Sequence, residues 1–307
     1  MNYSFQIGYY KAKQSQLLTK THYETLSKLD DIGFFEQLRD YGFGYFENIH
    51  DFYKKSIMDL KKELETTLDY DPLTRFFFLD FDSLYTKLIA KHIHYGISYE
   101  LDRLSTIDKN LIYNALKHRD YTFLNESDKV IFESINKHKD LTPKILSDVI
   151  EEAFLTQKHN IAKHNRDLLF YLEIDVTIKN ILSLLRAKRA KLSKEDLKSS
   201  IQPFGLFDNL KAMELYTYTN EELERYFGNL YVGYIGDAVK QYHQNQDLNK
   251  LSIELEKDLV QILKPRSYTS DTFGPIMYYV FLKKKEIENI QVLYMNRNVD
   301  LDNLVIG

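Results

Sequence analysis

The sequence contains no cysteine, and it has only 11 glycines and 5 prolines among its 307 residues. The absence of cysteine excludes disulfides, thiolate metal sites and cysteine nucleophiles, and it fits a reducing compartment, with the cytoplasm as the default location. Glycine and proline form most turns, so these low counts argue against a predominantly β fold of this length. Helix is therefore the expected secondary structure.

Two further absences concern membranes and polyanions. Residues 1–13 lack the basic start and apolar core of a signal peptide, and no charge-poor apolar run reaches the roughly 18 residues that span a bilayer. We therefore expect a chain that does not cross a membrane by itself. The net charge is −4 with 28% charged residues, which predicts no general attraction to nucleic acid or anionic lipid.

Apolar residues are abundant and recur at helical spacing along nearly the whole chain, as at Leu60, Leu64 and Leu68. The hydrophobic content of 44% is enough to bury a sizeable core. The 24 tyrosines and 19 phenylalanines favour packed helix seams that border water, or protein interfaces, and we expect seam packing for most of them.

Helix starts are indicated by hydroxyl residues three positions before an acidic residue, or directly before a proline. Such signals occur at Ser105 with Asp108, Ser193 with Asp196, Thr219 with Glu222, and Thr142 with Pro143. The clearest linker is residues 264–275, where prolines, a glycine and hydroxyl residues interrupt the apolar spacing, and a new helix is expected near Pro275.

Three segments of similar sequence recur at residues 81–92, 177–188 and 286–297. Their alignment pairs Ser83 with Asn180 (180 − 83 = 97) and Asn180 with Asn289 (289 − 180 = 109). Residues 60–68 and 255–263 also resemble each other, 255 − 60 = 195 residues apart, or about two periods. The repeats predict three helical modules, at 1–98, 99–198 and 199–307, around a pseudo-threefold axis with a central socket.

Catalytic motifs are not apparent. The chain has no phosphate-binding glycine loop ending in Lys-Ser or Lys-Thr and no nucleophile elbow, and its histidine pairs lack zinc spacing. Asp80 and Asp82 resemble the Asp-x-Asp of some metal-dependent transferases, but we interpret them as a helix start with surface carboxylates. We expect no metal, no cofactor and no catalytic residue.

Two basic clusters stand out, "RAKRAK" at residues 186–191 and "KKK" at 283–285. Both are short and lie in an acidic protein, so solvated helix faces or a patch facing another protein are better interpretations than nucleic-acid contacts. Because both clusters flank repeat helices, we expect them at the same end of the assembled modules.

The C-terminal segment, residues 273–298, contains Phe-Gly-Pro, an aromatic and aliphatic helix, and Lys-x-x-Glu-Ile-x-Asn-Ile. It resembles the signature of the central-stalk component of V/A-type rotary ATPases that is designated C or d. Residues 173–188 are similar to the middle repeat of that family, and residues 9–18 to its N-terminal helix. This chain departs from the family pattern at Lys13, where arginine is common, at Ser83, where asparagine is usual, and at "MNRNVDL", which replaces the commoner Gly-Lys.

The resemblance implies a non-catalytic part of the rotor, shaped as a funnel of three helical domains and present in one copy per complex. It would sit on the cytoplasmic face of the membrane ring of c or K subunits and receive the central shaft, made of the D and F subunits. It would transmit torque while other subunits hydrolyse ATP. On this interpretation we expect five residues to contact a neighbouring part of the rotor: Arg186, Arg189, Lys191, Lys283 and Lys284.

Two alternatives belong to other functional classes. One is a helical Asp-x-Asp enzyme in which Asp80 and Asp82 bind metal and the substrate is a diphosphate, although the second motif that such a site needs does not occur. The other is a helical nucleic-acid-binding or scaffold protein, which would show a continuous basic stripe across all three modules.

Overall fold

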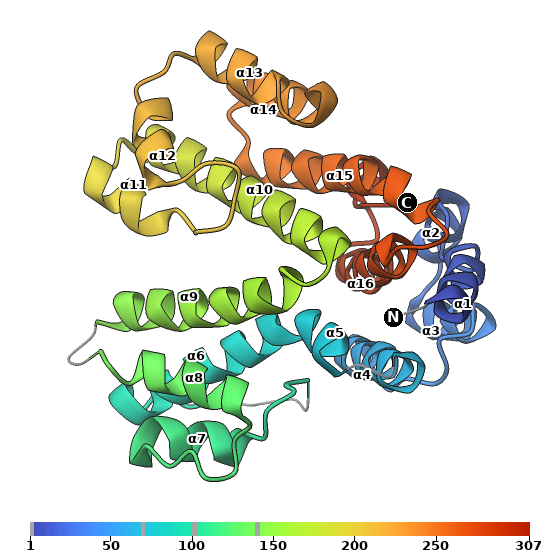
Figure 1. Cartoon of the computed structure of the whole chain (residues 1–307). Coiled ribbons are helices and arrows are strands. Elements are labelled where there is room, and N and C mark those ends of the chain that lie inside the picture. The colour runs from blue at the N-terminus through green and yellow to red at the C-terminus, as the bar shows by residue number, and fades with distance from the viewer. Residues whose placement is uncertain (1–2, 69–70, 100–103, 139–141) are drawn as a thin grey trace. The chain divides into compact units, whose positions relative to one another are not determined.

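The computed structural model describes residues 3–68, 71–99, 104–138 and 142–307. Within these residues all regular secondary structure is helical, with sixteen α-helices and two short 3₁₀ helices (Figure 1). The predicted all-α class is therefore confirmed.

The chain divides into two compact units. The first comprises Met1–Tyr53 and Arg166–Gly307. Its helices are α1 (Ser4–Gln14), α2 (Lys20–Ser27), α3 (Asp31–Asp40), α10 (Arg166–Ala190), α11 (Lys194–Ser200), α12 (Asn209–Leu215), α13 (Asn220–Gly228), η1 (Tyr231–Gly233), α14 (Tyr234–Asn245), α15 (Leu248–Ser267), α16 (Gly274–Met295) and η2 (Leu301–Asn303).

The second unit is Lys54–Asn165. Its helices are α5 (Asp71–Phe76), α6 (Leu79–Tyr95), α7 (Lys109–His118), α8 (Glu126–Ile135) and α9 (Pro143–Ala162), while α4 (Ile49–Thr67) crosses the boundary between the units. The two units are defined by how closely their residues pack, and each contains helices from more than one repeat. They therefore do not test the division into modules at 1–98, 99–198 and 199–307. That division stays a prediction.

Helix α16 forms the centre of the first unit, where α1, α2, α10 and α15 pack against it. All residues from 274 to 282 are buried, as expected for a helix that is apolar on every side. The first residue of α16, Gly274, is restricted to glycine by steric contact with α15. A Cβ on Gly274 would lie 2.3 Å from the carbonyl oxygen of Arg266, so only glycine fits where α15 and α16 meet. Pro275 then occupies the first turn, as predicted.

The helices that carry the repeated segments, α6, α10 and α16, each pack against a helix from another part of the chain. In the second unit α6 packs against α9, and in the first unit α10 packs against α15 and α16 against α1. Tyr10 of α1 and Tyr279 of α16 are both buried, with ring centroids 5.1 Å apart. This contact fits the expectation that the aromatic residues fill helix seams.

Helices α5 and α6 together correspond to the single helix α10. The repeat offset of 97 residues aligns α5 with the N-terminal part of α10, but the first copy is interrupted at Phe77 and Phe78. The Phe77 amide donates to the Thr74 carbonyl at 3.1 Å, and the Phe78 amide to the Arg75 carbonyl at 2.9 Å. These i→i+3 bonds form a tight turn between α5 and α6.

Most predicted helix starts are confirmed. Ser193 caps α11, Thr219 and Glu222 form a capping box on α13, and Thr142 caps α9 with Pro143 in its first turn. The prediction at Ser105 is wrong, because Asp108 caps α7 by accepting a hydrogen bond from the Asn110 amide.

The linker predicted at residues 264–275 is shorter than expected. Helix α15 continues through Pro265 to Ser267, and only residues 268–273 separate it from α16. Because proline lacks an N–H, position 265 cannot donate the usual i→i−4 hydrogen bond to the carbonyl of Gln261.

Candidate partner interface

The first predicted basic cluster lies at the C-terminal end of α10. Arg186, Arg189 and Lys191 are all exposed. Lys191 directly follows the helix and has φ = 52°, a left-handed conformation that helps to end it. These three cations therefore form an accessible positive group that a partner could reach.

Lys188 belongs to the same sequence cluster but makes internal contacts. Its Nζ donates to the carbonyl oxygens of Tyr216 at 2.8 Å and Tyr218 at 2.7 Å, and it lies 5.6 Å from the centre of the Tyr216 ring. It thereby satisfies carbonyls at the end of α12. Burial lowers the pKa of Lys188, as expected for a cation that points into the protein.

The second cluster lies within α16. Lys283 pairs with Glu286 one turn along the helix, and its Nζ is 4.2 Å from the centre of the Phe43 ring. Lys285 pairs with Glu256 at 2.9 Å and Glu288 at 2.8 Å. Lys284 is half-buried. Two of the three lysines in this cluster, Lys283 and Lys285, therefore make contacts within the first unit.

The two clusters do not occupy equivalent positions. One forms the last turn of α10, whereas the other lies in the interior of α16. We expected both clusters at a common end because we assumed that each one flanks its repeat helix. That assumption is wrong for the lysines of α16, which lie inside the helix. Whether any of the five predicted residues contacts a partner stays a prediction.

The Asp-x-Asp pair is used for packing inside the second unit. Asp80 is exposed and pairs with Lys158 of α9 at 2.8 Å. Asp82 is fully buried, so its interpretation as a surface carboxylate is wrong. Its Oδ1 accepts from Ser105 Oγ at 2.7 Å and the Thr106 amide at 2.6 Å, and its Oδ2 accepts from Thr106 Oγ1 at 2.5 Å.

Those three bonds explain why Asp82 tolerates burial, since a buried carboxylate needs donors on its oxygens. The same bonds occupy the oxygens that a metal ion would need. Among the described residues, no group of three acidic or histidine side chains is arranged to hold a metal ion. The alternative of a diphosphate enzyme at Asp80 and Asp82 therefore has no support in the geometry.

Asn180 of α10 forms a polar clamp on a segment that follows it. Its Nδ2 donates to the Gln202 carbonyl at 2.9 Å, and its Oδ1 accepts from the Gln202 amide at 2.8 Å. Asn180 is fully buried, and the amide side chain satisfies one backbone donor and one acceptor at once. The segment is thereby held against the repeat helix.

The same clamp recurs in α16. Asn289 Nδ2 donates to the Val305 carbonyl at 2.8 Å, and its Oδ1 accepts from the Val305 amide at 3.3 Å. In α6 the position belongs to Ser83, whose buried Oγ has no hydrogen-bond partner among the described residues, and the neighbouring Asp82 holds the following segment instead. The aligned asparagines were visible in the sequence, but their role was not predicted.

Glu286, also in α16, joins a segment near the N-terminus to this helix. Its side chain is buried, and Oε1 accepts from the Leu18 amide at 2.6 Å while Oε2 pairs with Lys283. Burial, together with the nearby charge of Glu286, raises the pKa of the Tyr23 hydroxyl far above its ordinary value. The Lys-x-x-Glu-Ile-x-Asn segment is therefore a packing motif that holds residues 18 and 305.

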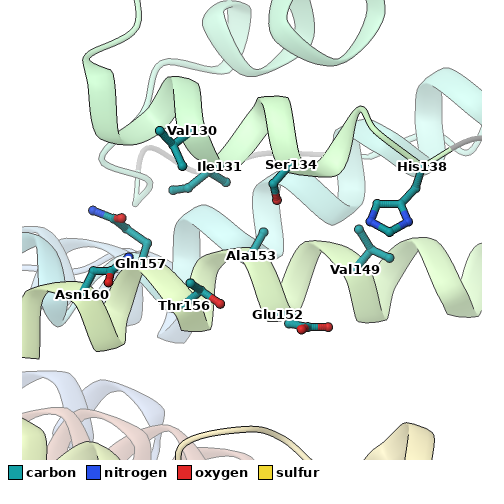
Figure 2. Close-up of a pocket in the computed structure, with 10 residues that line it drawn as sticks. All are labelled: Val130, Ile131, Ser134, His138, Val149, Glu152, Ala153, Thr156, Gln157 and Asn160. Atoms are coloured by element: carbon teal, nitrogen blue, oxygen red, sulfur yellow. The ribbon is translucent and has the colours of Figure 1, made fainter.

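A cavity of about 260 Å³ lies in the second unit between α8 and α9 (Figure 2). Its volume lies near the lower end of the roughly 300–1,000 Å³ that is typical of small-molecule sites. Its lining mixes small apolar and uncharged polar residues with one carboxylate and one imidazole. The lining residues are Val130, Ile131, Ser134, His138, Val149, Glu152, Ala153, Thr156, Gln157 and Asn160.

Several large apolar side chains are strongly exposed. Where such side chains form a contiguous patch, the surface is typical of a protein–protein contact. Those at least 70% exposed are Phe5, Ile32, Tyr45, Phe123, Leu210, Tyr268 and Met295. In the described part of the chain, no helix combines the length and the apolar character that crossing a bilayer requires.

These observations define an all-helical protein in which the buried polar groups of the repeat helices hold neighbouring segments in place. The family model described as ATP synthase (C/AC39) subunit matches residues 7–303. The chain therefore belongs to this family, and the resemblance seen in the sequence is confirmed. A search of curated proteins finds no match to the chain.

Proposed function

We propose that this protein is the non-catalytic rotor component that couples the central shaft of a V/A-type ATPase, made of the D and F subunits, to the membrane ring of c or K subunits. It would be present in one copy per complex on the cytoplasmic side of the cell membrane. ATP hydrolysis on other subunits would then drive cation transport through the ring. The observation that carries this proposal is the family match over residues 7–303.

Torque transmission requires stiffness, and the packing of the repeat helices supplies a physical basis for it. Each of α6, α10 and α16 packs against a helix distant in sequence, and each carries a buried polar group that fixes a following segment. Close-packed seams resist deformation because their side chains have no free volume to move into. Three such copies would form the three modules of a funnel.

The contact with a rotor neighbour is proposed to involve Arg186, Arg189 and Lys191, which are exposed on one short stretch of chain. Several charges acting together are needed, since a single surface ion pair contributes at most about 1 kcal/mol. Lys284 of α16, which is half-buried, is also proposed to contact the neighbour. Lys283 is included as well, although its ammonium group already pairs with Glu286.

The test is co-purification of the ATPase from membranes with the tagged protein. Wild-type protein should bring down the head subunits and the ring. The variant Arg186→Glu, Arg189→Glu and Lys191→Glu should retain its helical circular dichroism but recover several-fold less of one neighbour. Lys284→Glu is tested separately, and Lys283 is left unchanged because its reversal would break an internal pair.

The matched control reverses three exposed lysines elsewhere, Lys28, Lys62 and Lys250, and should leave recovery unchanged. Full recovery with the triple variant would remove these cations from the contact. If wild-type protein recovers neither head subunits nor ring, the coupling function itself is wrong.

A further inference from the structure

Asp258 of α15 is a half-buried carboxylate with an unsatisfied oxygen. Its Oδ2 is buried and has no hydrogen-bond partner among the described residues. A buried carboxylate oxygen without a donor is costly when ionised, because burial removes the water that would otherwise solvate its charge. Protonation removes that charge and allows the carboxyl group to become a hydrogen-bond donor.

The charged surroundings of Asp258 also favour a proton. Glu254 lies one turn earlier on α15, and the exposed Asp237 of α14, which packs against α15, adds a second negative charge. Among the described residues, the one cation that acts on Asp258 is Lys257, whose Nζ donates to Glu254 at 2.8 Å and to the Asp302 carbonyl of the η2 segment. Burial, followed by the charges of Glu254 and Asp237, raises the pKa of Asp258 to about 7.

Two ion pairs involve charged groups on the other helices that contact α15, and neither includes Asp258. Lys285 of α16 pairs with Glu256, which is about 200° around the helix from Asp258. Arg266 pairs with Asp167 of α10, and its position is about 12 Å along α15 from that of Asp258. The proton on Asp258 is therefore governed mainly by burial, by its own helix and by the contact with α14.

Helix α14 is joined tightly to α13. A Cβ on Gly236 would lie 2.5 Å from the Cα of Gly228, so the two backbones approach as closely as glycine allows. Glu224 of α13 also contacts His243 of α14, with 2.8 Å between Oε1 and Nδ1. Helices α13 and α14 should consequently move as one hairpin, and a change at Asp237 would act on both.

We propose that Asp258 is a proton-binding site that controls how firmly the hairpin of α13 and α14 docks on α15. With the proton bound, Asp258 and Asp237 do not repel each other and the hairpin is held. When the proton leaves, the negative charge of Asp258 is repelled by the charges of Glu254 and Asp237, and the hairpin loosens. This inference does not depend on the proposed coupling function, since it concerns contacts within the first unit.

The direction of the pH effect follows from proton linkage. An unfolded aspartate releases its proton near pH 4, whereas folded Asp258 retains it up to about pH 7. Between these values the docked protein binds a proton that the unfolded chain has lost. Docking is therefore favoured at the acidic end of this range and weakens as the pH rises through about 7.

The experiment is hydrogen exchange of the full-length protein at pH 6 and pH 8, corrected for the intrinsic rates. In the wild-type protein, protection of residues 220–245 should fall several-fold at pH 8. Asp258→Asn should remove this difference and keep the protection seen at pH 6. The control Asp271→Asn changes an exposed carboxylate and should retain the wild-type response.

A second variant keeps the proposal testable if Asp258→Asn does not fold. Asp237→Asn removes the like charge that α14 contributes, so ionised Asp258 no longer repels the hairpin and the fall in protection between pH 6 and pH 8 should become smaller. Protection of residues 220–245 that does not depend on pH in the wild-type protein would overturn the proposal. A full pH response that survives in either Asp258→Asn or Asp237→Asn would overturn it as well.

Discussion

The guanidinium of Arg266 in α15 lies over the ring of Phe170 in α10, with 3.8 Å between its central carbon and the ring centre. The same group donates to Asp167 at 2.6 Å. The second unit contains a related contact, in which Lys158 of α9 lies 5.2 Å from the centre of the Phe76 ring and pairs with Asp80. A cation held between an aromatic ring and a carboxylate thus occurs in two of the repeat-helix seams.

Replacing Arg266 should weaken the seam between α10 and α15. The Asp167 side chain is only 5% exposed, so Arg266→Ala leaves a buried carboxylate without its main charge partner. We expect a loss of about 2–3 kcal/mol in the free energy of unfolding, somewhat below the value for a fully buried pair because Arg266 is partly exposed. Urea denaturation followed by circular dichroism measures the change.

The exposed Arg225 of α13 is the matched control for this experiment. Arg225→Ala removes the same side chain from a surface position and should change stability by no more than about 0.5 kcal/mol. Equal losses for the two variants would show that the contact with Phe170 and Asp167 contributes nothing specific.

The polar clamp at Asn289 should hold the C-terminal segment. Asn289→Ala removes both hydrogen bonds to Val305 and leaves the buried backbone N–H and C=O of Val305 without these partners. The free energy of unfolding should fall by about 2–3 kcal/mol. Limited proteolysis should then cleave near residues 299–307 faster than in the wild-type protein. The exposed Asn298 provides the control, and cleavage that is equally fast in Asn298→Ala would contradict a role of the clamp.

Local spacing predicted much of the fold because helix periodicity and capping depend on residues within a few positions of one another. Ser193, Thr219 and Thr142 cap their helices as expected, since each needs only a backbone amide three positions ahead. Ser105 has the same local pattern, but its hydroxyl donates to Asp82, 23 residues away in the sequence. A long-range partner of this kind is invisible to a local rule.

The candidate interface was harder to predict for the same reason. Lys188 and Arg189 are adjacent, yet one points to the Tyr216 and Tyr218 carbonyls and the other is exposed. Lys283 has its carboxylate partner one turn away, but the Phe43 ring that it contacts comes from a distant segment. Charge clusters in a sequence therefore identify surfaces only when the side chains have no internal partners.

Asp82 and Ser83 offer a direct test of which side chain holds the first repeat. Asp82→Ala should lose about 3 kcal/mol, because it removes an acceptor of three hydrogen bonds from a buried site. Ser83→Ala should be neutral within about 0.5 kcal/mol or slightly stabilising, since its buried hydroxyl has no partner among the described residues. Chemical denaturation of both variants gives the comparison, and a larger loss for Ser83→Ala would contradict the assignment of the clamp to Asp82.

The two glycines Gly274 and Gly8 should respond in opposite directions to the same substitution. A Cβ at position 274 would lie 2.3 Å from the Arg266 carbonyl oxygen, so Gly274→Ala must push α15 and α16 apart and should lose about 2–3 kcal/mol. Gly8 lies within α1, and among the described residues no atom outside the nearby backbone of α1 lies within 4 Å of its Cβ position, so Gly8→Ala should gain about 0.5–1 kcal/mol from helix propensity. Thermal and urea unfolding of the paired variants measure both effects. A neutral Gly274→Ala would mean that the close approach of α15 to α16 is not needed for the seam.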